Sequence, residues 1–276
     1  MLIALKVDVQ TLRGVREGVP RLVDVLQRHR AGATFYLTPG PDHRTLPPRT
    51  DMGRRAGHLM RHIRDEGFET GLRAYDSVRW QRRIVDADAV WVEIEMQRGI
   101  AAYAAVFGEP PRTHAAAGWR MNVHALRLTQ RLGFDYASDS RGHAPYLPVW
   151  NAELIRCPQF PTTLPTIDEL VGRDDITIGN VAAHLLRQSS EAAADQVFTL
   201  SAEREGGKLV AVFEQLVVGW SAQGFSVVRL RDLYEAIEPL ALPRCETGWG
   251  TVPGRRHQLL VQQAPFLADA DTRRAA

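Results

Sequence analysis

The sequence has 276 residues, a formal net charge of +2 and a hydrophobic content of 45%, values typical of a globular protein with a sizeable core. The charge argues against a dedicated nucleic-acid-binding protein, and two cysteines are too few for a disulfide framework. No window approaches the ~20 apolar residues of a membrane span, and the N-terminus lacks the pattern of a secretory signal. We therefore expect a cytoplasmic protein without a membrane span.

The hydrophobic pattern alternates between strand and helix through most of the chain. The predicted strands are 2–9, 33–38, 69–75, 112–118, 134–138, 153–157, 196–203 and 226–230. The predicted helices are 20–32, 57–66, 86–107, 122–132, 178–188, 209–222 and 231–237. Helix 86–107 has Val90, Ile94, Ala101 and Ala105 as its apolar stripe. Such alternation predicts a closed or nearly closed (β/α) barrel of about seven parallel strands joined by crossover helices.

Two stretches fall outside this alternation. Residues 39–55 are rich in Pro, Arg and polar side chains and form the longest irregular stretch, a length typical of functional loops. The tail from Pro239 contains Pro and Gly and is predicted to wrap the surface. Because no linker or internal repeat divides the chain, we predict one barrel domain over 1–240 and a C-terminal extension over 241–276.

The first predicted strand ends in a candidate catalytic residue. Side chains alternate along a strand, so Lys6, Asp8 and Gln10 share one face. An Asp at the carboxyl end of a strand is where α/β barrels place catalytic groups. The alternative is that Asp8 only caps the turn that leads to Gly14.

Four stretches of the sequence together resemble the polysaccharide deacetylase family. They are VDV at 7–9 followed by TLRGVREGVP at 11–20, AAAGWR at 115–120, SDSRG at 138–142 and TLPTIDE at 163–169. The resemblance covers about residues 3–240 and is strongest to the branch that deformylates 4-deoxy-4-formamido-arabinose on an undecaprenyl phosphate lipid. It implies a distorted (β/α) barrel and hydrolysis of an amide on a sugar.

The same resemblance implies that the metal ligands of the family are substituted in this chain. In the family, a strand-end Asp is the general base, and a second Asp with a His-x-x-x-His motif binds a divalent metal. Asp8 matches the base, whereas the metal-binding positions hold Gln10, Arg73 and Ser77, and Ser201 replaces a late His expected to assist the leaving group. A catalytic divalent site needs about three protein ligands, and a guanidinium would repel the ion. We therefore expect no metal at this position and no other cofactor.

A second potential metal site is the pair His58 and His62, four residues apart on one helix face. This spacing can bind zinc, but the glutamate of a metalloprotease motif is missing. The helix is also expected to pack outside the barrel. We favour two partly exposed histidines.

Without the metal, Asp8 and Arg73 are predicted to meet at the same end of the barrel. In one interpretation the guanidinium holds the carbonyl oxygen of the substrate while Asp8 activates water. The protein would then be a metal-independent hydrolase of a non-peptide C–N bond, similar to an N-deacylase or deformylase. In the other, the pair fills the space of the metal in an inactive homologue that binds a ligand or acts as a scaffold.

Further candidates are expected around this pair. Asp76 is the third predicted catalytic residue. The predicted substrate-binding residues are Gln10, Arg13, Tyr75, Trp80, Trp119, Arg120, Asp139, Arg141, Ser201 and Glu203. The two tryptophans can stack on a sugar or simply pack, and Arg13, Arg16, Arg120 and Arg141 can hold an anion or form structural ion pairs.

The substrate is predicted to be small and soluble, with a sugar derivative as the first candidate. The lipid-modifying branch carries a longer, apolar insertion after the second strand, whereas residues 39–55 are polar and lack an amphipathic surface for a bilayer. We therefore expect neither a membrane nor a nucleic acid as a partner.

Overall fold

The core of the protein is a curled parallel sheet, as shown by a computed structural model that describes residues 1–43 and 50–267. Its strand order is β10–β1–β2–β5–β6–β7, with β11 paired to the amino-terminal half of β1. The strands are β1 (Leu2–Val9), β2 (Thr34–Leu37), β5 (Glu69–Leu72), β6 (Thr113–His114), β7 (Tyr136–Ala137), β10 (Gln196–Ser201) and β11 (Ser226–Val228). All seven lie within predicted strands, and the predicted fold class is confirmed.

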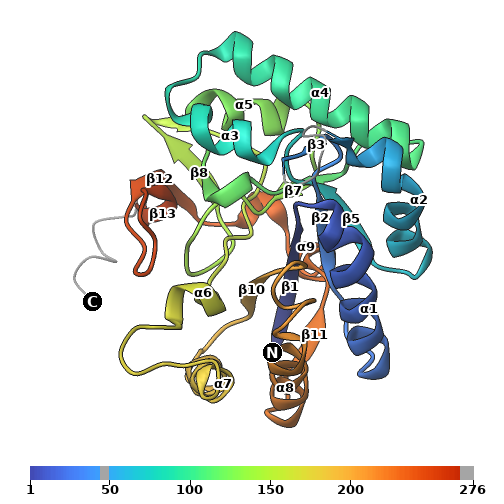
Figure 1. The fold of residues 1–276 in the computed structure, drawn as a ribbon. Coiled ribbons are helices and arrows are strands. Elements are labelled where there is room, and N and C mark those ends of the chain that lie inside the picture. The colour runs from blue at the N-terminus through green and yellow to red at the C-terminus, as the bar shows by residue number, and fades with distance from the viewer. Residues whose placement is uncertain (44–49, 268–276) are drawn as a thin grey trace.

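Helices surround this sheet, with α1, α2 and α8 outside the central strands in Figure 1. The helices are α1 (Val19–Arg28), α2 (Met52–Asp65), α3 (Ser77–Arg83), α4 (Ala89–Phe107), α5 (Val123–Arg131), α6 (Ile167–Leu170), α7 (Val181–Ser190), α8 (Val210–Ala222) and α9 (Leu230–Glu235). Short helical turns are η1 (Gly14–Gly18), η2 (Ile84–Asp86), η3 (Ala117–Trp119) and η4 (Pro239–Ala241). The sequence did not predict α3 or α6, because both are too short for a periodic apolar stripe.

Side-chain caps fix where four of the helices begin. Asp51, Asp76, Asp88 and Asn122 accept hydrogen bonds from backbone N–H groups in the first turns of α2, α3, α4 and α5. Asp and Asn are favoured at this position because their oxygens satisfy donors that have no partner within the helix. The Asp76 cap starts α3 shortly after β5 ends, three residues beyond Arg73.

The predicted apolar stripe of α4 faces solvent, which corrects the expectation for this helix. Val90 and Ile94 are 67% and 51% exposed, while Trp91, Met96 and Tyr103 are buried. The helix has apolar residues on both faces, so periodicity alone did not identify the buried one.

The sheet is closed by an irregular segment between its edge strands β7 and β10. The N–H of Phe160 donates to the carbonyl oxygen of Ala137 in β7 (2.8 Å). The N–H groups of Thr163 and Leu164 donate to the carbonyl oxygen of Val197 in β10 (3.1 and 3.2 Å). Residues 158–164 therefore bridge the gap without forming a regular strand.

The predicted parallel strand at 153–157 is wrong. This region forms a separate four-stranded sheet in the order β13–β12–β8–β9, with β8 (Leu147–Trp150), β9 (Glu153–Leu154), β12 (Arg244–Gly250) and β13 (Leu259–Pro265). Strands β8 and β9 are antiparallel. Asn151 and Ala152 have φ values of +50° and +64° and turn the chain back on itself. Periodicity could not reveal a turn built from such residues.

The tail forms a hairpin and does not simply wrap the surface. Strands β12 and β13 are antiparallel, and β12 also pairs with β8. Arg141 exchanges backbone hydrogen bonds of 2.8 Å with Leu260 and Gln262 of β13, which attaches the hairpin to the barrel. The division into a domain over 1–240 and an extension over 241–276 stays a prediction.

The predicted irregular stretch 39–55 contains two short antiparallel strands, β3 (Pro41–Asp42) and β4 (Thr50–Asp51). Residues 44–49 of this stretch lie outside the described part of the chain. Among the helices of the described ranges, none has the length and hydropathy to cross a bilayer.

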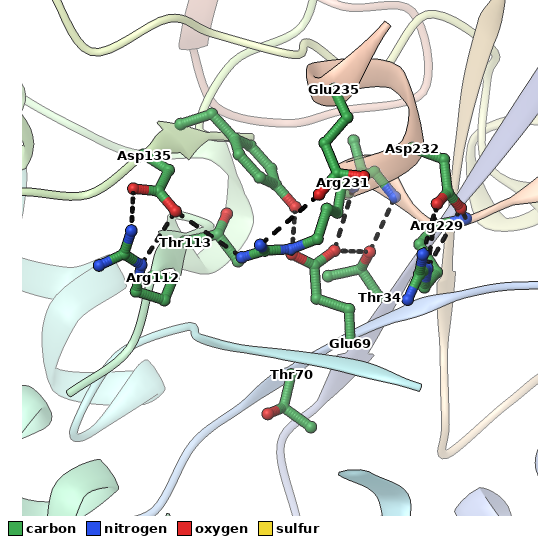
Figure 2. Close-up of polar contacts among 12 residues, drawn as sticks. Thr34, Glu69, Thr70, Arg112, Thr113, Asp135, Arg229, Arg231, Asp232 and Glu235 are labelled. Atoms are coloured by element: carbon green, nitrogen blue, oxygen red, sulfur yellow. Dashed lines mark hydrogen bonds and ion pairs between the residues drawn. The ribbon is translucent and has the colours of Figure 1, made fainter. Parts of the chain in front are cut away.

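An ionic network covers the amino-terminal end of the barrel, whereas Asp8 and Arg73 lie at the carboxyl ends of their strands. Figure 2 shows the polar contacts of this network. Glu69, at the start of β5, accepts hydrogen bonds from the hydroxyls of Thr34 (2.6 Å) and Tyr136 (2.7 Å). It also accepts from the backbone N–H (3.1 Å) and Nε (3.2 Å) of Arg231. One carboxylate thus joins β2, β5, β7 and α9.

We expect Glu69→Ala to lower the free energy of unfolding by about 2–4 kcal/mol, because it leaves several donors without their acceptor in a mostly buried site. Chemical denaturation measures this change. The matched control is Glu235→Ala, which removes only an exposed carboxylate 3.8 Å from Arg231 and should have much less effect. Equal losses for the two variants would contradict a central role for Glu69.

Candidate functional site

The carboxyl end of β1 lies in the middle of the sheet and carries Asp8. In the strand register, Asp8 pairs with Ser201 of β10 on one side and with Tyr36 of β2 on the other. Two residues earlier, Lys6 lies inside the barrel, where its Nζ donates to the carbonyl oxygen of Ser138 (2.5 Å). Alternation along the strand places Asp8 on this same interior face, as the sequence predicts.

The guanidinium of Arg73 lies against the Asp8 carboxylate. The distance from Arg73 Nε to Asp8 Oδ2 is 3.1 Å, and the two residues are only 2% and 7% exposed. The predicted contact between them is confirmed. Nε does not aim its hydrogen at the carboxylate, whereas Nη1 donates to Ser77 Oγ (2.7 Å). Within the described chain, Asp8 Oδ1 and Arg73 Nε are buried without a hydrogen-bond partner.

Two other carboxylates hold the turn after β1. Glu203 Oε1 accepts from the backbone N–H groups of residues 10 and 11 and from the Thr11 hydroxyl, each at 2.9 Å. Asp42 Oδ2 accepts from the N–H of Leu12 (2.8 Å). These donors are therefore not available to Asp8, and the interpretation that Asp8 caps this turn is wrong. Glu203 supports the turn that carries Gln10.

A cavity of about 180 Å³ opens at these strand ends. It is lined by Asp8, Gln10, Arg73, Gln81, Gly118, Trp119, Thr166, Asp168, Thr199, Leu200, Ser201, Arg204, Glu205 and Arg255. Five of these are predicted site residues: Asp8, Gln10, Arg73, Trp119 and Ser201. A neighbouring cavity of about 270 Å³ shares Gln10, Ser201 and Arg204 and is also lined by Ser77 and Glu203.

Trp119 is the aromatic residue that the structure brings to Asp8. Its Nε1 donates to Thr162 Oγ1 (3.0 Å), and the guanidinium carbons of Arg255 and Arg141 lie 4.8 and 5.1 Å from its ring centroid. Arg141 itself is buried and donates to Glu169 Oε1 (2.6 Å), which is a structural ion pair. Arg141 therefore supports Trp119 and does not line this cavity.

Asp139 and Trp80 are buried among other protein groups. Asp139 Oδ1 accepts from the N–H of Ala116 and lies 2.7 Å from His114 Nδ1. Trp80 packs against Trp91, and its Nε1 donates to the carbonyl oxygen of Arg120 (2.8 Å). Of the two readings for Trp80, packing is the one that the structure supports.

Asp76 and Tyr75 line a different cavity, of about 540 Å³. Asp76 Oδ1 accepts from the N–H groups of Val78 and Arg79 and lies 2.8 Å from His43 Nε2. Its oxygens thus cap α3, and the structure does not bring Asp76 into the cavity of Asp8.

The remaining predicted arginines also lie outside the cavity of Asp8. Arg13 is exposed and pairs with Glu17 one helical turn away (3.0 Å), and Arg16 is exposed as well. Arg120 lines a third cavity, next to that of Asp8, and its Nη1 donates to the carbonyl oxygen of Gln81.

Comparison with known proteins identifies the family. The family model described as "Polysaccharide deacetylase" matches residues 2–137. The protein "Probable 4-deoxy-4-formamido-L-arabinose-phosphoundecaprenol deformylase ArnD" of Shewanella sediminis is 31% identical over 266 residues, which cover 84% of this chain and 86% of that protein. The chain belongs to the polysaccharide deacetylase family. The predicted resemblance is confirmed.

Solved structures of the family share this fold. The probable polysaccharide deacetylase of Pseudomonas aeruginosa PAO1 has a TM-score of 0.63 at 16% identity, covering 84% of this chain and 90% of that one. A pseudoenzyme of the CE4 family from Bacillus anthracis has a TM-score of 0.55 at 10% identity, covering 84% and 65%. At these identities the likeness concerns the fold alone.

The donor set around Asp8 does not fit the divalent metal that the family implies. The positions that the resemblance assigns to metal ligands hold Gln10, Arg73 and Ser77, and the Arg73 guanidinium contacts both Asp8 and Ser77. A permanent cation there opposes a metal ion electrostatically. In residues 1–43 and 50–267, no three His, Cys, Asp or Glu side chains are grouped as ligands. His58 and His62 are exposed on α2, and His62 Nε2 lies 3.5 Å from Glu66.

Several polar and charged residues that line the cavity of Asp8 were not predicted from the sequence. Asp168 and Thr166 belong to the TLPTIDE stretch that carries the resemblance, so a signal for them was present. Arg255 lies on the tail hairpin, beyond that resemblance, and donates to Glu169 Oε1 (2.7 Å) and Thr166 Oγ1 (2.9 Å).

Inside the barrel, burial lowers the pKa of Lys6 to about 8, although Asp8 and Asp139 oppose this shift.

Glu205 is the cavity residue with the most perturbed acidity. Burial raises the pKa of its carboxyl to about 7, with nearby Asp168 acting in the same direction. The N–H of Ser201 donates to Glu205 Oε2 (2.7 Å) and, together with Arg204, opposes the shift. A carboxyl group with this pKa can give up or take a proton near neutral pH.

The raised pKa of Glu205 predicts how the free energy of unfolding changes with pH. Its pKa of about 7 in the folded protein exceeds the ordinary glutamate value of 4.5, so the folded state binds more protons between these two pH values. Its stabilising contribution is therefore complete at low pH and is lost as the pH rises through 7. We expect Glu205→Gln to flatten the fall in unfolding free energy between pH 5 and pH 8, measured by urea denaturation. Glu93→Gln, at an exposed site on α4, is the control; an unchanged slope in Glu205→Gln would contradict the assignment.

Proposed function

We propose that the protein is a metal-independent hydrolase that removes a formyl or acetyl group from the amine of a small, soluble sugar derivative in the cytoplasm. The observation that carries this proposal is Asp8, which lines a cavity beside Arg73 and keeps one oxygen without a partner. A carboxylate in this state can accept a proton from water at a barrel end where such enzymes place their chemistry.

Three residues divide the work in the proposed reaction. Asp8 takes a proton from water as the water oxygen attacks the acyl carbon, and the Arg73 guanidinium donates to the oxyanion that forms. The C–N bond then breaks, and Glu205 in its acid form gives its proton to the leaving amine. The products are formate or acetate and the free amine. The pKa of about 7 suits Glu205 to this part.

Arg73 supplies only part of what a metal would supply. A guanidinium stabilises the oxyanion, but it does not lower the pKa of bound water as a divalent ion does. We therefore expect slower turnover than for a metal-dependent deacetylase.

The substrate class rests on the relatives and on the loop after β2. The S. sediminis relative is named as a deformylase of an amino sugar that is carried by a lipid phosphate. We propose the same amide chemistry on a substrate without the lipid chain, because residues 39–55 lack the apolar character that would suit a bilayer.

A turnover screen tests this proposal. Purified protein is incubated with N-formyl and N-acetyl amino sugars, and released formate or acetate is measured with and without EDTA. We expect release from at least one compound and the same rate in the chelator. Activity that disappears in EDTA and returns with added zinc would contradict metal independence, and no release from any compound would favour the alternative below.

The alternative is an inactive family member that binds a ligand or a catalytic partner. The observation in its favour is the Arg73 guanidinium, which is almost fully buried and already contacts both Asp8 and Ser77. Such a pair can fill the space of the metal and stabilise the fold without doing chemistry. This protein would show saturable ligand binding in the same screen without any released acid.

A further inference from the structure

A cavity of about 440 Å³ next to that of Asp8 is lined by cationic side chains. Residues of α3 and of the loop of the β12–β13 hairpin contribute to its lining. The lining residues are Val78, Gln81, Arg82, Gly118, Arg120, Gly254, Arg255, Arg256, His257 and Leu259. Gln81, Gly118 and Arg255 also line the cavity of Asp8, so the two cavities adjoin.

The lining of this cavity is more positively charged than the chain as a whole. The whole sequence balances 34 basic residues against 32 acidic ones, whereas the cavity has four arginines and no carboxylate. Arg82 and Arg256 are exposed, and neither has an ion-pair partner among the residues with described positions. Guanidinium groups gathered without counter-charge attract an anion from solution.

Two of the arginines differ from this exposed pair. Arg255 is already neutralised, because it contacts Glu169 and lies 3.0 Å from Asp168 Oδ2. Arg120 donates from Nη1 to Gln81, but its Nε is buried without an acceptor. A buried N–H without a partner is unfavourable, and an anion in the cavity would offer acceptors to this guanidinium.

From these observations we propose that this cavity binds a phosphate group of the substrate while the acylated amine lies beside Asp8. Arg82 from α3, Arg120 after η3 and Arg256 from the hairpin loop approach from three elements, which suits the several oxygens of a phosphate. The inference rests on the proposed function only for the reaction in the adjoining cavity. A soluble sugar phosphate and a lipid-linked sugar phosphate present the same group to this cavity, so the chemistry of recognition is shared.

Calorimetric titration of the full chain with inorganic phosphate and with a sugar 1-phosphate tests this site. We expect both probes to bind, more weakly at high salt, and binding to fall on the order of tenfold for each guanidinium removed in Arg82→Gln and Arg256→Gln. Both positions are exposed, so the variants should fold normally. The control Arg21→Gln with Arg131→Gln makes the same change of net charge at exposed sites on α1 and α5 and should bind like the unmodified protein.

Vesicles of phosphatidylcholine with phosphatidic acid form a second arm of the experiment. Binding to the free phosphates assigns the site to a soluble substrate, and binding to the vesicles alone assigns it to a lipid-linked one. The proposal is overturned if no probe binds, if the Arg82 and Arg256 variants bind as well as the unmodified protein, or if the control loses binding equally. Formate release from an uncharged N-formyl sugar is measured separately, so failure of the hydrolase proposal is distinguished from failure of this site.

Discussion

Replacing Arg73 by alanine should lower the free energy of unfolding by about 3–5 kcal/mol, the range for breaking a buried ion pair from one side. The change leaves the Asp8 carboxylate in the barrel without its contact at 3.1 Å and removes the donor to Ser77 Oγ. Lys6 remains on the same interior face and offsets part of the loss. Urea denaturation at neutral pH measures the difference.

Two further variants identify the origin of this loss. Arg13→Ala removes the same residue type from an exposed pair with Glu17 and should change stability little. The double variant Asp8→Asn with Arg73→Met removes both charges of the buried pair and should be more stable than Arg73→Ala, because no uncompensated charge remains. If the double variant were the less stable of the two, packing of the long Arg73 side chain, and not its charge, would explain the effect.

The ion pair could be predicted because both of its residues end neighbouring parts of one regular sheet. Alternation along β1 and the parallel order of β1, β2 and β5 fix where Asp8 and Arg73 emerge. The resemblance to the family supplied the order of these strands, and strand alternation then gave the centre of the site. Trp80 was expected near it, but α3 was not predicted, and this helix turns the ring into the core.

The rim of the site could not be predicted, because long-range contacts build it. Arg255 reaches the cavity only because β12 and β13 form a hairpin against β8, a pairing that local patterns do not encode. Burial raises the pKa of Glu205, and burial depends on the whole packed structure and not on neighbouring residues in the sequence. Asp76 is the opposite case. It was predicted to be catalytic, but its carboxylate accepts hydrogen bonds from the first turn of α3, which is a purely local contact.

Replacing Asp8 by asparagine should reduce turnover by about 10²–10⁴-fold, the usual contribution of a general base. Asparagine keeps the size of the side chain but cannot take the proton from water. The structure changes the expectation for stability, because the buried Arg73 guanidinium then loses its counter-charge. Released formate or acetate is therefore measured per folded molecule, with the folded fraction taken from near-UV circular dichroism.

The double variant Asp8→Asn with Arg73→Met separates catalysis from folding. It should recover much of the stability lost in Asp8→Asn and remain inactive, because the base is still missing. Asp24→Asn, at an exposed pair with Arg28 on α1, is the control and should retain full turnover. Full activity in Asp8→Asn would show that another group takes the proton, and the proposed reaction would then lose its base. Activity that follows stability through all these variants would instead mean that Asp8 acts only through the ion pair that holds the end of the barrel together.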